Sequence, residues 1–123
     1  SLRYRETDDA SIDRRKMLAG ASPNFVHSLD AAALTFTVSK CIDEGITDFA
    51  MVHDSYGTHS PNMPLLNNKL REAFVEMYED NDVLLNLYTS AVATLPQGVI
   101  VPPPPAKGTL NLKEVLQSDY FFA

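Results

Sequence analysis

The spacing of apolar residues predicts a long helix over residues 22–45. An amphipathic helix places side chains three, four or seven positions apart on one face, and this spacing is met by Phe25, Leu29, Ala32, Ala33 and Phe36. Serine is a good N-cap and proline suits the first helical position, so Ser22-Pro23 fits the start of this helix. Gly45 fits its end.

A β-hairpin is predicted next. The apolar run from Phe49 to Val52 has the length of a buried strand, and the segment from Tyr56 to His59 fits a return strand. Aspartate and serine favour tight reversals. We therefore expect the chain to turn at Asp54-Ser55, at the tip of the hairpin.

Two further helices should follow this hairpin. Pro61 and Pro64 bracket the start of the first, whose apolar residues at helical spacing are Leu66, Leu70, Ala73, Phe74 and Met77. The second follows the break at Asn81-Asp82, and its corresponding residues are Leu84, Leu87, Tyr88 and Ala91.

The C-terminal part of the chain is rich in proline. Five of the eight prolines lie in residues 96–108, and four of them are consecutive, which predicts an extended polyproline spacer. Asn111 and Glu114 resemble a capping box for a short terminal helix. We expect an α+β, mostly helical fold of four segments: an N-terminal polar segment (1–21), the helices and hairpin (22–95), the Pro-rich spacer (96–110) and a C-terminal tail (111–123).

Length and composition fit one domain or a piece of a larger one. The chain has 123 residues, of which 45% are apolar and 21% charged, values that exclude disorder of the whole chain. No apolar run approaches the roughly 18 residues of a membrane span and no signal peptide opens the chain, so we expect no membrane partner. The net charge of −6 argues against a self-sufficient nucleic-acid-binding domain.

The most distinctive candidate site is the His53-Asp54 pair. A carboxylate at a hairpin tip, held by a buried strand, suits a divalent cation. Alternatively, Asp54 is present only because aspartate favours turns. Mg²⁺-dependent phosphoryl transfer normally uses at least two carboxylates around a pair of ions, so Asp54 alone does not complete such a site.

His27 is a second candidate. It lies one turn into the first predicted helix, where it either faces a substrate as a hydrogen-bonding group or is satisfied locally. The sequence has no zinc-ligand spacing, because Cys41 stands alone, and it has no Walker loop, Gly-rich dinucleotide fingerprint or G-x-S-x-G motif.

Three segments together resemble the C-terminal end of the single-subunit DNA-dependent RNA polymerases, the T7-like phage and mitochondrial family. Ser22-Pro23-Asn24-Phe25-Val26-His27-Ser28-Leu29-Asp30 resembles the helix that carries the P-N-F-[IV]-H-S motif. Val52-His53-Asp54-Ser55-Tyr56-Gly57-Thr58 resembles polymerase motif C. The family's tail is similar to Ala106-Lys107-Gly108, Leu110-Asn111-Leu112 and the closing Ser118-Asp119-Tyr120-Phe121-Phe122-Ala123.

This resemblance implies a role for each matched residue. Asp54 would be one of two aspartates that hold the catalytic Mg²⁺ ions, and His53 would lie beside it near the growing RNA 3′ end. His27 would lie in the nucleotide pocket and help to sense the ribose 2′-OH. Phe122 and Ala123, with the terminal carboxylate, would fold back towards the active site.

The resemblance also implies that the chain is part of an enzyme, a DNA-directed RNA polymerase. The second metal-binding aspartate and the helix that grips the incoming triphosphate lie upstream in this family and outside this chain. We therefore expect a C-terminal piece of the palm and fingers region, inactive alone. In the whole enzyme its partners would be the DNA template, the RNA product, NTPs and the remainder of the polymerase chain.

Two alternatives remain beside this reading. A-family DNA polymerases have a similar motif C, but with glutamate after the His-Asp pair, so Ser55 favours an RNA polymerase. The chain could also be an acidic, helix-rich interaction module derived from a polymerase tail that has lost catalysis.

Two sequence features bear on whether the chain resembles the phage or the mitochondrial branch of the family. Gly57 is more typical of the phage branch, whereas the ending Tyr120-Phe121-Phe122 leans towards the mitochondrial one. We favour a phage or prophage enzyme in the cytoplasm of a bacterial host, with the mitochondrial matrix as the alternative.

Overall fold

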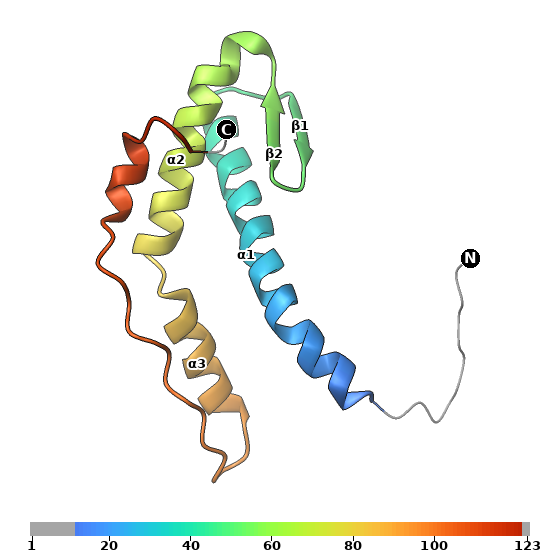
Figure 1. Cartoon of the computed structure of the whole chain (residues 1–123). Helices are drawn as coiled ribbons and strands as arrows, with labels where there is room; N and C mark the ends of the chain where they lie inside the picture. The colour runs from blue at the N-terminus through green and yellow to red at the C-terminus, as the bar shows by residue number, and fades with distance from the viewer. Residues whose placement is uncertain (1–11, 122–123) are drawn as a thin grey trace, which may run out of the picture.

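A computed structural model describes residues 12–121 of the chain. It is mostly helical, with one two-stranded antiparallel hairpin, as expected for an α+β fold (Figure 1). The elements in chain order are α1 (Arg14–Asp43), β1 (Phe49–Val52), β2 (Ser55–Thr58), the 3₁₀ turn η1 (Ser60–Asn62), α2 (Met63–Glu79), α3 (Val83–Thr94) and the 3₁₀ helix η2 (Leu112–Leu116).

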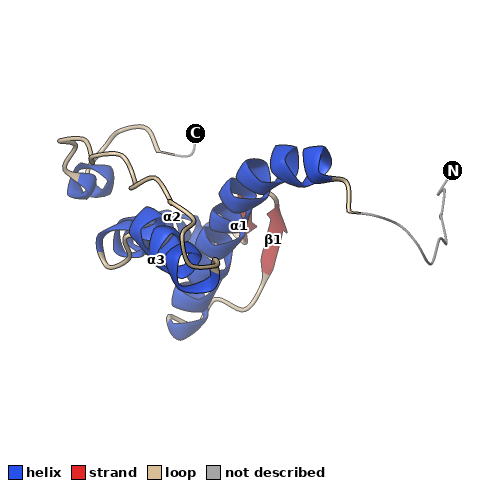
Figure 2. Ribbon diagram, turned by 90° about the horizontal axis from the view of Figure 1, so that it is seen from below, coloured by secondary structure: helices blue, strands red, loops and turns tan. Residues whose placement is uncertain are grey.

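Helices α1 and α2 form the centre of the structure and pack on each other (Figure 1). Helix α3 continues below α2, and the proline-rich segment then returns beside α3 to η2, which packs on α2. Figures 1 and 2 show the hairpin and η2 on opposite sides of the α1–α2 pair. Among the described residues, no helix is long and apolar enough to cross a bilayer.

A small apolar core lies where the C-terminal end of α1 meets α2. It consists of Cys41, Ile46 and Leu66, each at most 2% exposed. Partly buried residues of the hairpin and of α2 pack against this core: Phe49, Met51, Tyr56 and Leu65. Burial raises the pKa of the Cys41 thiol, so Cys41 stays protonated and packs as a small apolar residue.

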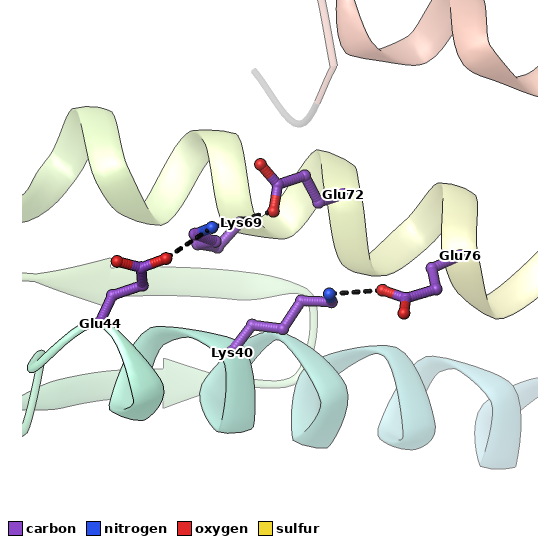
Figure 3. A network of polar contacts seen from close by, with 5 residues as sticks. All are labelled: Lys40, Glu44, Lys69, Glu72 and Glu76. Atoms are coloured by element: carbon purple, nitrogen blue, oxygen red, sulfur yellow. Dashed lines mark hydrogen bonds and ion pairs between the residues drawn. The ribbon is translucent and has the colours of Figure 1, made fainter.

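Charged side chains also connect the same two helices (Figure 3). Lys40 on α1 pairs with Glu76 on α2, and Lys69 on α2 pairs with Glu44 just beyond α1, at 2.9 Å between Nζ and Oε1. Lys69 also contacts Glu72 at 3.0 Å. Lys69 donates hydrogen bonds to the carboxylates of Glu44 and Glu72, which raises the pKa of Lys69, and the hydrogen bond to Glu44 lowers the pKa of Glu44.

The first helix begins at Arg14, eight residues before the predicted start at Ser22, so that prediction is wrong. Asp13 is the N-cap, and its carboxylate accepts hydrogen bonds from the amides of Arg15 and Lys16 at 3.1 Å each. Pro23 therefore lies inside α1. Proline removes only one helical donor, and the helix continues through it on an exposed stretch where water reaches the freed carbonyl. Residues 14–21 of the predicted polar segment 1–21 thus belong to α1, and residues 1–11 lie outside the described part.

The hairpin is confirmed, but its turn lies one residue earlier than predicted. Val52 pairs with Ser55, so His53 and Asp54 form the turn instead of Asp54-Ser55. His53 has a φ of 53°, which is the positive φ that two-residue hairpin turns require at their first position. Serine therefore belongs to β2, and the histidine is the residue in the left-handed conformation.

The remaining elements follow the sequence pattern closely. Helices α2 and α3 occur where predicted, and Asp82 caps α3 by accepting a hydrogen bond from the amide of Leu85 at 3.1 Å. Residues 96–110 contain neither helix nor strand, as expected for a proline-rich spacer. The short terminal helix is a 3₁₀ helix, η2, capped by the side chain of Asn111.

Leu66→Ala tests whether this small core holds the fold together. We expect the free energy of unfolding to fall by about 2–5 kcal/mol, because a leucine that is 2% exposed leaves a cavity when truncated. Leu18→Ala is the matched control, since Leu18 is also helical but 77% exposed, and it should change stability by less than about 0.5 kcal/mol. Denaturant titration measures both, and equal losses would contradict the assignment of the core.

Candidate functional site

A groove between α1 and the hairpin turn gathers the sequence-predicted site residues. Its volume is about 660 Å³, and its lining residues are His27, Asp30, Ala31, Leu34, His53 and Asp54. We call it the α1–hairpin groove. It contains three of the five predicted site residues, and His27 on α1 lies 26 residues before His53 on the turn.

The helical side of this groove follows from simple periodicity. Asp30, Ala31 and Leu34 lie three, four and seven residues after His27, so all four share one face of α1. His27 and Asp30 are exposed and Leu34 is partly buried. The polar groups of this face are therefore accessible to a ligand, with an aliphatic side chain beside them.

Strand pairing determines which residues form the hairpin side of this groove. The register Phe49–Thr58 to Val52–Ser55 leaves His53 and Asp54 as the projecting turn. At the base of the hairpin, the Thr58 hydroxyl donates to the backbone carbonyl of Asp48 at 2.7 Å. Both turn residues are exposed, so the carboxylate of Asp54 is presented to solvent on a paired scaffold.

Gly57 allows the two strands to approach closely. It pairs with Ala50, and a Cβ at position 57 would lie 3.1 Å from the Ala50 carbonyl oxygen. This distance is shorter than a comfortable van der Waals contact. A side chain at position 57 would therefore fit only if the Ala50 backbone shifted by a few tenths of an ångström.

The groove is electrostatically negative. Asp30 faces it from the helix and Asp54 from the turn, and neither carboxylate pairs with a cationic side chain within residues 12–121. Their negative charges also affect the nearby Tyr56 phenol. Burial raises the pKa of Tyr56, and the charges of Asp30 and Asp54 raise it further. Burial and Asp30 likewise raise the pKa of Tyr78.

Asp54 also borders a second cavity on its other side. This cavity, about 310 Å³, lies between β2 and α2, and its lining residues are Asp54, Ser55, Tyr56, Met63, Leu66, Asn67 and Leu70. Asp54 is thus part of the lining of two hollows. Its carboxylate is placed where groups bound on either side could reach it.

The residues present suit a magnesium ion only as part of a larger ligand set. Mg²⁺ prefers carboxylate oxygens and commonly takes one or two carboxylates together with substrate phosphates and water, and Asp54 is an exposed carboxylate with no cationic partner among the described residues. Within residues 12–121, no three histidine, cysteine, aspartate or glutamate side chains gather as a metal site. A metal at Asp54 would need further ligands from outside this part of the chain.

The predicted tail residues Phe122 and Ala123 lie outside the described residues. Just before them, the ring of Phe121 packs edge-on against Phe74 of α2, with 5.1 Å between centroids. Tyr120, in contrast, is 86% exposed. The Phe121 ring thus provides one contact between this part of the tail and α2.

Two residues of the site were not singled out from the sequence. Asp30 had a usable signal, because it lies three residues after His27 and therefore on the same helical face. Tyr56 had none, since its position near both carboxylates depends on how the hairpin packs on the core between α1 and α2.

Two aspartate variants test the geometry of the α1–hairpin groove through the pKa values of two tyrosines, Tyr56 and Tyr78, that lie outside its lining. We expect Asp30→Asn to lower the pKa of both Tyr56 and Tyr78, because its carboxylate destabilises both phenolates. Asp54→Asn should lower the pKa of Tyr56 alone. Carbon-13 NMR titration of the tyrosine Cζ resonances measures both values.

Asp43→Asn, at the far end of α1, is the control and should leave the pKa of both tyrosines unchanged. If Asp54→Asn left the pKa of Tyr56 unchanged, the turn would not face this side chain as described.

Comparison with known proteins shows where the chain belongs. A family model described as DNA-dependent RNA polymerase matches residues 1–101. The chain is 40% identical over 125 residues to the DNA-directed RNA polymerase of Enterobacteria phage K11, covering 99% of this chain and 14% of that enzyme. It is 41% identical over 118 residues to T7 RNA polymerase of Escherichia phage T7, covering 94% of this chain and 13% of that enzyme.

A plant relative is equally similar. DNA-directed RNA polymerase 1, mitochondrial, of Arabidopsis thaliana is 44% identical over 118 residues, covering 96% of this chain and 12% of that protein. The chain thus spans only 12–14% of the length of these three relatives. Relatives of this kind occur in both phages and plant mitochondria, and this chain belongs to the T7-like, single-subunit DNA-dependent RNA polymerase family.

Proposed function

We propose that this chain is a C-terminal part of the palm and fingers region of an RNA polymerase that transfers nucleotides from NTPs to the RNA 3′ end on a DNA template. The observation that supports this most strongly is the α1–hairpin groove, where His27 meets His53 and Asp54. These residues lie in two separate motifs, and the fold brings both motifs to one solvent-accessible place. The remainder of the polymerase would cover this place and supply the other catalytic groups.

Asp54 is the residue that we assign to metal binding. Its carboxylate is exposed and anionic, and the paired hairpin holds it in place. A second aspartate from elsewhere in the polymerase would complete the ligand set. When bound, Mg²⁺ would neutralise charge on the transferring phosphoryl group and activate the attacking 3′ oxygen.

The two histidines have positioning roles in this proposal. His53 is next to Asp54 on the turn, so we place it beside the RNA 3′ end. His27 projects from the helical wall of the same groove, where it can hydrogen-bond the ribose 2′-OH of the incoming nucleotide. Phe122 and Ala123 are proposed to contact the substrate side of the active site through the chain terminus.

We further propose a phage or prophage origin, with activity in the cytoplasm of a bacterial host instead of a mitochondrial matrix. Gly57 supports this proposal, because glycine at this position of motif C resembles the phage branch of the family. The genomic neighbourhood of the coding sequence tests the proposal.

Asp54→Asn, made in the polymerase that carries this chain, tests the metal-binding role. We expect the elongation rate to fall more than about 100-fold, because an uncharged amide is a poor Mg²⁺ ligand. Promoter binding should be nearly unchanged. Asp43→Asn is the matched control, since Asp43 is exposed at the end of α1 and outside the groove.

A fall of less than about tenfold for Asp54→Asn, or roughly 1.4 kcal/mol, would contradict a central metal-binding role. It would favour the alternative of a non-catalytic interaction module.

His27→Ala tests the contact with the ribose. A site that hydrogen-bonds a hydroxyl discriminates against substrates that lack it, so this variant should incorporate dNTPs more readily relative to NTPs. Competition between each NTP and its dNTP in single-nucleotide addition measures the ratio. His59→Ala is the control, because His59 is an exposed histidine beyond the hairpin and outside the groove. Unchanged selectivity in His27→Ala would leave this residue with a local structural role.

A further inference from the structure

Arg71 is the most constrained charged residue in the described part of the chain. It lies in the middle of α2 and is only 9% exposed. Its Nε donates to the Asn67 side-chain oxygen at 2.9 Å, one helical turn earlier. Its Nη1 donates to the carbonyls of Val115 and Ser118 at 2.6 and 2.7 Å, and to the Ser118 hydroxyl at 3.0 Å.

These hydrogen bonds join parts of the chain that are far apart in sequence. Val115 and Ser118 lie 44 and 47 residues after Arg71, at the end of η2 and just beyond it. The Phe121 ring also lies against the guanidinium, 5.5 Å from its central carbon to the ring centroid. Arg71 therefore holds residues 115–121, which we call the C-terminal latch segment, against α2.

The other side of the guanidinium leads to the hairpin turn. Asn67, which accepts the hydrogen bond from Nε, is also a wall residue of the cavity that Asp54 borders. A continuous path of contacts thus runs from the latch segment through Arg71 and Asn67 to the hollow beside Asp54. Asn67 lies at the midpoint of this path.

The chemistry of this path requires an arginine. The four acceptors are two carbonyls, one amide oxygen and one hydroxyl, so the buried charge gains directed hydrogen bonds and, within residues 12–121, no ion pair. A planar guanidinium can donate from Nε in one direction and from Nη1 in another at the same time, whereas the ammonium of lysine is a single point. The arrangement of acceptors therefore selects for geometry as well as for positive charge.

We propose that Arg71 is a positioning residue that fixes the C-terminal latch segment relative to the Asp54 cavity. Its catalytic consequence rests on the proposed polymerase function, but the structural latch does not. When Arg71 is in place, the latch segment has one register on α2. When the guanidinium can no longer donate to both Asn67 and the latch segment, the segment detaches from α2. The Asn67 side chain, which lines the Asp54 cavity, then loses its hydrogen bond to Arg71.

Arg71→Lys in the whole polymerase is the central test. The substitution keeps the positive charge and most of the buried methylene chain but removes the planar guanidinium. We expect faster hydrogen–deuterium exchange in residues 112–121, and a fall of about tenfold in kcat for single-nucleotide addition with the KM for NTP changed less than about twofold. The kcat of Arg71→Lys should be no higher than that of Arg71→Met, because a positive charge without the guanidinium hydrogen bonds does not hold the latch segment on α2.

Lys113→Met is the matched control. Lys113 is also a cation that connects the C-terminal segment to α2, through Glu79 at 3.7 Å, but it is 66% exposed and does not reach Asn67. It should leave both exchange and kcat near the unmodified values. Ser118→Ala provides a milder variant, because it removes one acceptor and keeps Arg71 itself; its changes should be smaller and in the same direction.

Three outcomes separate this inference from the proposed function. Unchanged exchange in Arg71→Lys and Ser118→Ala would overturn the latch. Increased exchange with normal kcat, in a polymerase that Asp54→Asn inactivates, would overturn the positioning role. If Asp54→Asn stayed active, the proposed function would fail, and the exchange measurement alone would still decide whether Arg71 holds the segment.

Discussion

The packing of α1 against α2 around Cys41, Ile46 and Leu66 is the contact on which the rest of the structure depends. The hairpin follows α1 directly, and residues of both its strands pack on this core. The direction of the turn is therefore set by apolar burial some distance from the turn itself. Because the core is small, the relative position of Asp54 and His27 across the groove depends strongly on each of its side chains.

Charge is distributed so that the groove carboxylates stay available. The lysines of the α1–α2 contact, Lys40 and Lys69, are paired with glutamates on these helices (Figure 3). Asp30 and Asp54, on the hairpin side of α1, have no such partner among residues 12–121. An acidic chain can thus contain both a tightly paired helix contact and an open anionic groove, and the open groove is the part suited to a cation.

Much of the fold and part of the site could be predicted from the sequence. Local signals were sufficient for α2, α3 and the hairpin, because apolar spacing, prolines and an aspartate cap act within a few residues. The start of α1 was misplaced because Ser22-Pro23 is a strong local signal for a helix start, and only the cap at Asp13 shows that the helix is already formed. The turn was misplaced because strand pairing, and not the turn preference of Asp54-Ser55, decides which two residues connect the strands.

Long-range contacts were beyond local patterns. Nothing near Arg71 in the sequence indicates that it reaches residues more than forty positions later, and Asn67 gives no local sign that it borders a cavity with Asp54. The meeting of His27 with Asp54 was expected only from the family resemblance. Its physical basis is the packing of hairpin side chains on the core between α1 and α2.

The most direct test of the central claim is a structure of the polymerase that carries this chain, bound to template, RNA, an NTP and Mg²⁺. We predict a Mg²⁺ ion within about 2.0–2.1 Å of a carboxylate oxygen of Asp54, with the ribose of the NTP on the His27 side of the α1–hairpin groove. A metal site that excludes Asp54, or a nucleotide bound away from this groove, would contradict the assignment.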